Sequence, residues 1–181
     1  MADFEPTHPL GNDTSLSNGG VEITAEPVAW MVQLFASNGK GAAVEKALGI
    51  SGKPGQASKT RNFTALPVSP DQWMLVAPQK TTTTTASLIK KIGKNGYVSE
   101  QSDSRVRFHI SGPRARDLMA RGCRLDLHDD LTGKGFCAQT SMAQVGVLLH
   151  QTEDHAEYDL YVYSGFARSF WHWLKETAAQ F

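Results

Sequence analysis

The sequence predicts an α+β fold made of two halves that share one order of elements, β-α-β-β-α-β, over residues 28–100 and 105–181. The first observation is periodicity, because apolar residues recur at the two-residue spacing of strands and then at the 3.6-residue spacing of helices. The second is internal similarity between the strand–helix segments of the two halves. The similar segments are residues 30–50 with 106–127, and residues 71–92 with 157–177.

The first half begins with a central strand, because residues 28–35, VAWMVQLF, are apolar on both faces apart from Gln33. A glycine turn and a helix with an apolar stripe follow. Five threonines, residues 81–85, suit a helix interior poorly, so we expect a loop and a helix N-cap there. The other predicted elements are strands at 63–68, 73–77 and 97–100 and a helix around residues 88–92.

The second half begins with a strand in which Val106, Phe108 and Ile110 alternate with polar residues. The other predicted elements are a helix at 113–121, one or two strands within 138–150, a strand at 158–163 and a helix at 166–180. Two ferredoxin-like halves of this kind would pair their sheets in a single domain, residues 28–181.

Residues 1–27 are rich in Gly, Asn, Ser, Thr and Pro and hold few apolar side chains. Such a segment buries little surface by itself, which predicts a flexible N-terminal arm. Two interpretations stay open. The arm is either a disordered tail or a segment that lies on a partner subunit, anchored by Phe4 and Leu10.

Composition and charge exclude several classes of function. The 18 basic and 18 acidic residues balance, so nothing points to nucleic acid or to an anionic membrane. No signal peptide is visible, and no apolar run approaches the ~20 residues of a membrane span. We therefore expect a cytoplasmic protein in which Cys123 and Cys137 are reduced thiols, one of them filling a small space in the core.

Motifs of common enzymes are missing from the sequence, which has no P-loop and no G-x-S-x-G. The turn at residues 39–41 lacks the third glycine and the later acidic residue of a dinucleotide site, so it predicts a plain strand–helix turn. His150 and His155 are not spaced to share one helix face, as zinc motifs require. The residues therefore predict no catalytic, cofactor-binding or metal-binding site.

Three stretches carry a resemblance to a known family. They are ISGPRARDLMARGCRLDLH, CAQTSMAQVGVLLH and YDLYVYSGFARSFWHWLKETAAQF. Together they resemble the gamma subunit of heterotetrameric bacterial sarcosine oxidase, and SPDQWMLVAP matches more loosely. A wider similarity runs to the folate-binding domain of the glycine-cleavage T-protein, whose fold is of the predicted kind.

This resemblance implies a non-catalytic structural subunit that assembles with alpha, beta and delta subunits and contacts mainly alpha. The complex would oxidatively demethylate sarcosine to glycine, giving hydrogen peroxide and either formaldehyde or 5,10-methylenetetrahydrofolate. The resemblance places FAD, FMN and NAD in the larger subunits and zinc in the smallest, with tetrahydrofolate as co-substrate and no cofactor on this chain. A scaffold for another flavin amine oxidase, such as one for dimethylglycine, stays open.

Asp126 is the candidate ligand-binding residue that the T-protein resemblance supplies. Its position after the short helix matches that of a folate-facing carboxylate, which could bind the N–H groups of a pterin. Here Arg-Leu-Asp-Leu replaces the usual Asn-Asp pair, and a loop-capping Asp is the other interpretation. The alternative function is therefore a stand-alone folate-binding protein or folate-dependent one-carbon enzyme.

The last predicted helix has two apolar faces. Phe170, Trp171 and Leu174 share one stripe, whereas Trp173 lies about 200° round the helix from Trp171. Phe166 and Trp173 therefore mark a second face. We interpret it as a subunit interface, where Trp and Phe are enriched, although a wide stripe with one partly exposed Trp would give the same pattern.

Overall fold

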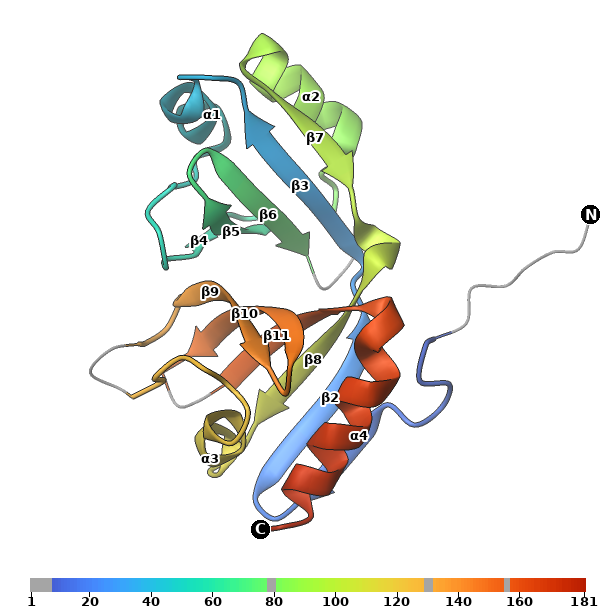
Figure 1. The fold of residues 1–181 in the computed structure, drawn as a ribbon. Coiled ribbons are helices and arrows are strands. Elements are labelled where there is room, and N and C mark those ends of the chain that lie inside the picture. The colour runs from blue at the N-terminus through green and yellow to red at the C-terminus, as the bar shows by residue number, and fades with distance from the viewer. Residues whose placement is uncertain (1–7, 78–80, 129–131, 155–156) are drawn as a thin grey trace, which may run out of the picture.

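The computed structural model describes residues 8–77, 81–128, 132–154 and 157–181. These residues form two antiparallel sheets, each with helices on its outer face (Figure 1). The strand order is β4-β5-β6-β3-β7 in the five-stranded sheet and β1-β2-β8-β11-β10-β9 in the six-stranded sheet.

The five-stranded sheet and two helices form the first half. Its elements are β3 (Trp30–Ala36), α1 (Gly41–Leu48), β4 (Ser58–Lys59), β5 (Thr64–Ser69), β6 (Gln72–Ala77), α2 (Thr85–Ile92), the 3₁₀ turn η1 (Gly93–Asn95) and β7 (Gly96–Glu100). The helices pack on one face of the sheet through a buried cluster that includes Leu34, Val44 and Leu88. The threonine run supplies the predicted N-cap, because the Thr84 side chain accepts a hydrogen bond from the backbone N–H of Ser87.

The six-stranded sheet and two further helices form the second half. Its elements are β1 (Ser15–Asn18), β2 (Val21–Pro27), the 3₁₀ turn η2 (Ser102–Ser104), β8 (Arg105–Ser111), α3 (Ala115–Ala120), β9 (Cys137–Met142), β10 (Val145–Glu153), β11 (Glu157–Tyr163), the 3₁₀ turn η3 (Ser164–Phe166) and α4 (Ala167–Ala178). α3 and α4 cover one face of this sheet. The rings of Phe108 and Phe170 meet edge to face there, with their centroids 5.2 Å apart.

Both halves have the strand order of a ferredoxin-like fold. The order β5-β6-β3-β7 in the first half recurs as β10-β11-β8-β2 in the second. The predicted α+β class with two ferredoxin-like halves is therefore confirmed. However, the fourth strand of the second half is β2, which precedes the first half in the chain, so residues 105–181 are incomplete by themselves.

The predicted flexible arm is wrong for residues 15–27, which form β1 and β2. The pairing of β2 with β8 runs from Glu22 to Pro27, all but the first residue of β2. Val21, Ile23 and Ala25 are at most 3% exposed, and the residues between them point to the other face. The period-2 pattern VEITAE was therefore a strand signal that the polar composition of the surrounding segment concealed.

The helix-free faces of the two sheets pack on each other. The molecule thus has four layers, with helices outside and the sheets inside (Figure 1). The buried cluster between the sheets includes Met31, Leu66 and Met74 of one sheet and Cys137, Leu148 and Tyr161 of the other. Both cysteines are free thiols, as predicted, and burial raises the pKa of Cys137 to about 11.

The helices are short. α4, with 12 residues, is the longest in the described ranges, and α3 has 6. None of the helices within those ranges is long and apolar enough to cross a membrane.

Because β2 completes the second half, Ile23→Ala should lower the free energy of unfolding by about 2–5 kcal/mol, the usual result of removing a buried aliphatic side chain. Urea unfolding followed by circular dichroism measures this change. Glu22→Ala, on the exposed face of the same strand, should change stability little. If the two variants were equally stable, the prediction of a flexible arm would be supported instead.

Candidate functional site

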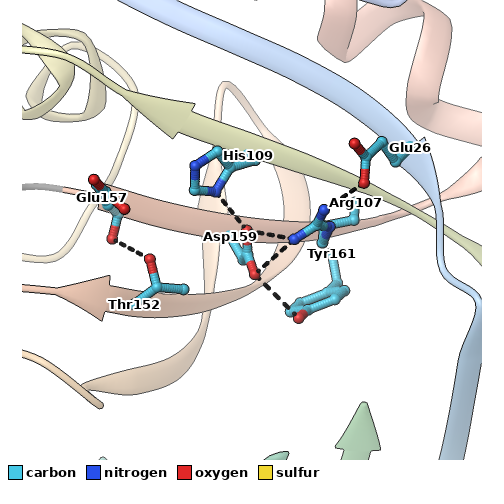
Figure 2. Close-up of polar contacts among 7 residues, drawn as sticks. All are labelled: Glu26, Arg107, His109, Thr152, Glu157, Asp159 and Tyr161. Carbon is cyan, nitrogen blue, oxygen red and sulfur yellow. Dashed lines mark hydrogen bonds and ion pairs between the residues drawn. The ribbon is translucent and has the colours of Figure 1, made fainter. Parts of the chain in front are cut away.

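Polar side chains gather on the inner face of the six-stranded sheet. Asp159 of β11 stands in register with His109 of β8 and His150 of β10, so the three residues lie side by side across three strands. Arg107 and Tyr161 form the next pair along the same face. Figure 2 shows Asp159 at the centre, with His109, Arg107 and Tyr161 directed towards its carboxylate.

The Asp159 carboxylate connects these side chains. His109 Nδ1 lies 2.9 Å from its Oδ1. Arg107 Nη1 lies 3.4 Å from both carboxylate oxygens, and the Tyr161 hydroxyl donates to Oδ2 across 3.5 Å. Glu26 of β2 pairs with Nη2 of Arg107 and so extends the cluster to a fourth strand. Among the contacts made by the Asp159 carboxylate itself, the one with His109 is the shortest and therefore the strongest.

Burial and charge act in opposite directions on Asp159, which is 4% exposed. Burial favours a raised pKa, but the hydrogen bond with His109 and the positive charge of Arg107 outweigh it and lower the pKa of Asp159 below its ordinary value. The same hydrogen bond raises the pKa of His109, against the effect of its own burial. Both shifts favour an ion pair in which Nδ1–H of His109 donates to Asp159.

His150, on the other side of Asp159, has its pKa shifted in the opposite direction to that of His109, which favours the neutral ring. Burial lowers its pKa, and the positive charge of Lys59 lowers it further, while Asp159 acts in the other direction. Lys59 belongs to β4 in the five-stranded sheet, so its charge reaches His150 from across the sheet interface. Within the described residues, the His150 ring has no hydrogen-bond partner.

A cavity of about 490 Å³ lies between this cluster and the five-stranded sheet. Lys59, Thr64 and Val76 form its opposite wall and stand in register across β4, β5 and β6. The lining also includes the charged residues Lys134, Glu153 and Glu157. The cavity falls within the volume range of small-molecule sites in proteins, roughly 300–1,000 Å³.

The chemistry available in this cavity is that of polar binding. Carboxylates, imidazoles and a lysine can bind and orient a charged ligand, and histidine can exchange a proton near neutral pH. The Thr152 hydroxyl is occupied, because it donates to the carbonyl oxygen of Glu157 across 3.3 Å. Across the described ranges, no three His, Cys, Asp or Glu side chains are placed to hold a metal ion. His155 lies outside the described residues.

Asp126, the predicted folate-facing residue, is exposed and lies apart from this cavity. Its Oδ1 accepts a hydrogen bond from the backbone N–H of His128 across 3.0 Å. One carboxylate oxygen therefore caps the local turn, as in the loop-capping interpretation. The folate role of Asp126 stays a prediction.

The predicted interface residues have different surroundings. Phe166 is 54% exposed, whereas Trp173 is partly buried and stacks on Phe170 with a centroid distance of 5.9 Å. An added Cβ on Gly122 would lie 2.6 Å from the Trp173 ring, so this indole packs closely on its own chain. Leu10 also packs against the core of the six-stranded half, and Phe4 lies outside the described residues.

Sequence reasoning missed the Asp159 cluster, because its members come from four strands, β2, β8, β10 and β11, that are separated along the chain. One local feature could have identified its centre. Asp159 interrupts the apolar strand YDLYVY, and a charge at the middle of such a strand needs a partner when it is buried. The partners themselves depend on the strand register.

A comparison with protein families decides what the chain is related to. The family described as "Sarcosine oxidase, gamma subunit family" matches residues 35–180. The chain belongs to this family. The resemblance given by the sequence is thereby confirmed. The match covers both ferredoxin-like halves except the N-terminal strands β1 and β2 and most of β3.

Relatives of this gamma-subunit chain support the assignment. It is 29% identical to "Sarcosine oxidase subunit gamma" of Corynebacterium sp. (strain P-1), over 90% of this chain and 82% of the relative. Among solved structures, it matches a chain of heterotetrameric sarcosine oxidase from Corynebacterium sp. U-96, solved with pyrrole 2-carboxylate. The TM-score is 0.81 at 23% identity, with 93% of this chain and 88% of that chain covered.

The predicted likeness to the glycine-cleavage T-protein is also confirmed at the level of fold. The gamma-subunit chain matches aminomethyltransferase T of the glycine cleavage system from Bartonella henselae with a TM-score of 0.64 at 15% identity. The match covers 87% of this chain and 46% of that chain. The shared fold carries no shared activity by itself.

Asp159→Asn should lower the free energy of unfolding by about 3–5 kcal/mol at neutral pH, because it leaves His109 and Arg107 without their buried partner. The exposed Glu153, which pairs with Lys134, provides a matched control: Glu153→Gln should change stability little. Urea unfolding measures both. Similar losses in the two variants would mean that the cluster does not stabilise the fold.

The pH dependence follows from the signs of the shifts. The pKa of His109 is raised above its ordinary value of 6.5. Its contribution to folding stability is therefore fully present below pH 6.5 and is lost as pH rises through the folded-state pKa. The pKa of Asp159 is lowered below its ordinary value of 3.8. Its contribution to folding stability is therefore fully present above pH 3.8 and is lost only as pH falls through the folded-state pKa. Between about pH 6 and pH 9, the native chain should therefore lose more stability than Asp159→Asn.

The folate prediction for Asp126 has a direct test. If the carboxylate only caps the turn, Asp126→Ala should lower stability by about 0.5–1.5 kcal/mol and should leave tetrahydrofolate binding unchanged or absent. Calorimetric titration of the native chain and the variant with tetrahydrofolate separates the two interpretations. Binding by the native chain that disappears in the variant would establish the folate role.

Proposed function

We propose that this chain acts as a structural, non-catalytic gamma subunit in a cytoplasmic, heterotetrameric sarcosine oxidase. The family match over most of the chain carries the proposal, together with the likeness to a chain of a heterotetrameric complex. The complex oxidatively demethylates sarcosine to glycine, and it releases hydrogen peroxide with either formaldehyde or 5,10-methylenetetrahydrofolate. The partners are alpha, beta and delta subunits, with alpha as the main contact.

The geometry at α1 supports the proposal that FAD, FMN and NAD belong to other subunits. A dinucleotide fold places a phosphate at the start of the helix that follows the first strand. Here the Asp71 carboxylate takes that position: an added Cβ on Gly41, the first residue of α1, would lie 1.9 Å from Asp71 Oδ1. A carboxylate there repels phosphate. Zinc would belong to the smallest subunit, and tetrahydrofolate would serve the complex as co-substrate.

An exposed aromatic patch supports a role in assembly. We define the Tyr163–Phe166 patch as the exposed rings of Tyr163 and Phe166, at the junction of β11 and α4, with the buried Arg105 of β8 beneath Tyr163. Tyr163 is 47% and Phe166 54% exposed, and the Arg105 guanidinium lies 4.0 Å from the centroid of the Tyr163 ring. Tyr and Phe are enriched at the centres of protein interfaces. The patch therefore extends the interface predicted at Phe166.

Phe166→Asp should weaken assembly at least tenfold, because a charge would replace a half-exposed ring that a partner buries. The stability of the isolated chain should change little. Ile89→Asp is the matched control, since Ile89 is 52% exposed on α2 of the other half. The measurement is a pull-down of the tagged full chain from its host, with subunit masses, flavin absorbance and sarcosine oxidation recorded.

The native chain should bring down a yellow, sarcosine-oxidising complex, and Ile89→Asp should do the same. A colourless chain without partners would overturn the proposed function. A complex lost in Ile89→Asp but retained in Phe166→Asp would keep the function and move the interface to the five-stranded half.

A further inference from the structure

Most charges that line the cavity between the sheets are already paired. The two carboxylates of Asp159 and Glu26 are balanced by His109 and Arg107. Lys134 Nζ donates to Glu153 Oε2 across 2.5 Å. These pairs need no ligand to compensate them.

One cation and one carboxylate remain among the described residues that line the cavity. Lys59 of the five-stranded sheet and Glu157 at the start of β11 both line it, and neither side chain has an ion-pair partner within the described ranges. Lys59 lies close enough to His150 for its charge to lower the pKa of that imidazole. Glu157 lies close enough to His109, and more distantly to Lys134, for its negative charge to raise the pKa of each. The two unpaired charges therefore face the cavity beside different histidines.

A site that is left with one charge of each sign complements a ligand that carries both signs. We propose that the cavity between the sheets binds a free α-amino acid as its zwitterion, with the carboxylate held by Lys59 and His150 and the ammonium by Glu157. The neutral His150 ring can donate an N–H to the carboxylate without an added charge. The inference does not depend on the proposed function.

The volume and walls of the cavity favour an amino acid with an apolar side chain. About 490 Å³ is more space than glycine fills, and liquid water takes roughly 30 Å³ per molecule. Val76 and the ring of Tyr161 supply apolar surface next to the charged groups. An aliphatic side chain would displace water from this surface and add affinity.

Binding to the full chain can be measured by NMR, with L-leucine, glycine, acetate and methylamine as probes and the imidazole resonances of His109 and His150 as reporters. L-Leucine should bind most tightly and glycine next. Acetate and methylamine should each bind more weakly than glycine, because each engages only one of the two unpaired charges. The His150 resonances should respond to acetate, and the His109 resonances to methylamine.

Two variants separate the two ends of the site. Lys59→Met should weaken the binding of L-leucine and of acetate about tenfold and leave the affinity for methylamine unchanged. Glu157→Gln should weaken the binding of L-leucine and of methylamine about tenfold and leave the affinity for acetate unchanged. Lys53→Met, which removes an exposed lysine outside the cavity lining, should change none of them. Thermal unfolding of each variant confirms that the fold is retained.

Two outcomes would overturn the proposal. If acetate binds as tightly as L-leucine and Glu157→Gln has no effect, the cavity is a simple anion site. At about 10 mM, even a site whose binding free energy is only a few kcal/mol is largely occupied. If no probe shifts the imidazole resonances at that concentration, the cavity is not an amino-acid site.

Discussion

The contact between the helix-free faces of the two sheets is the constraint on which the rest of the structure depends. Each sheet carries buried apolar side chains on both faces, and its helices cover only one of them. The other face, with residues such as Leu66, Met74 and Leu148, can leave water only by meeting its counterpart. Each such side chain contributes roughly 1.5–3 kcal/mol when it is fully buried. The two halves are thus joined by a shared core as well as by the chain.

The Asp159 cluster lies on that same shared face, where an unpaired charge would be very unfavourable. Strand register resolves the conflict, because it places His109 and Arg107 beside the carboxylate. A slip of one residue between β8 and β11 would move these partners to the helix-covered face and leave Asp159 alone. The cluster therefore favours one register, and its polar side chains line the cavity between the sheets.

Local pattern was enough to predict most of the fold. The alternation of Val106, Phe108 and Ile110 predicted β8, and the double-sided apolar run predicted β3. The boundary between β9 and β10 was harder, because the hairpin turns at Ala143 and Gln144, both with positive φ, where Asn or Gly is the usual choice. The Asp159 cluster could not be predicted, since it depends on which strands become neighbours, and that follows from the packing of the whole sheet.

The position of β2 has a consequence for how the molecule is built. The first half, from β3 to β7, is inserted between two adjacent strands of the second half, β2 and β8. During synthesis, β2 emerges before the first half, but its partner β8 follows only after the whole first half. Closing so long a loop is slow, and a folded insert that brings its own ends together shortens the effective loop. Folding of the first half thus brings the end of β2 close to the start of β8, so that the two strands can pair in the six-stranded sheet.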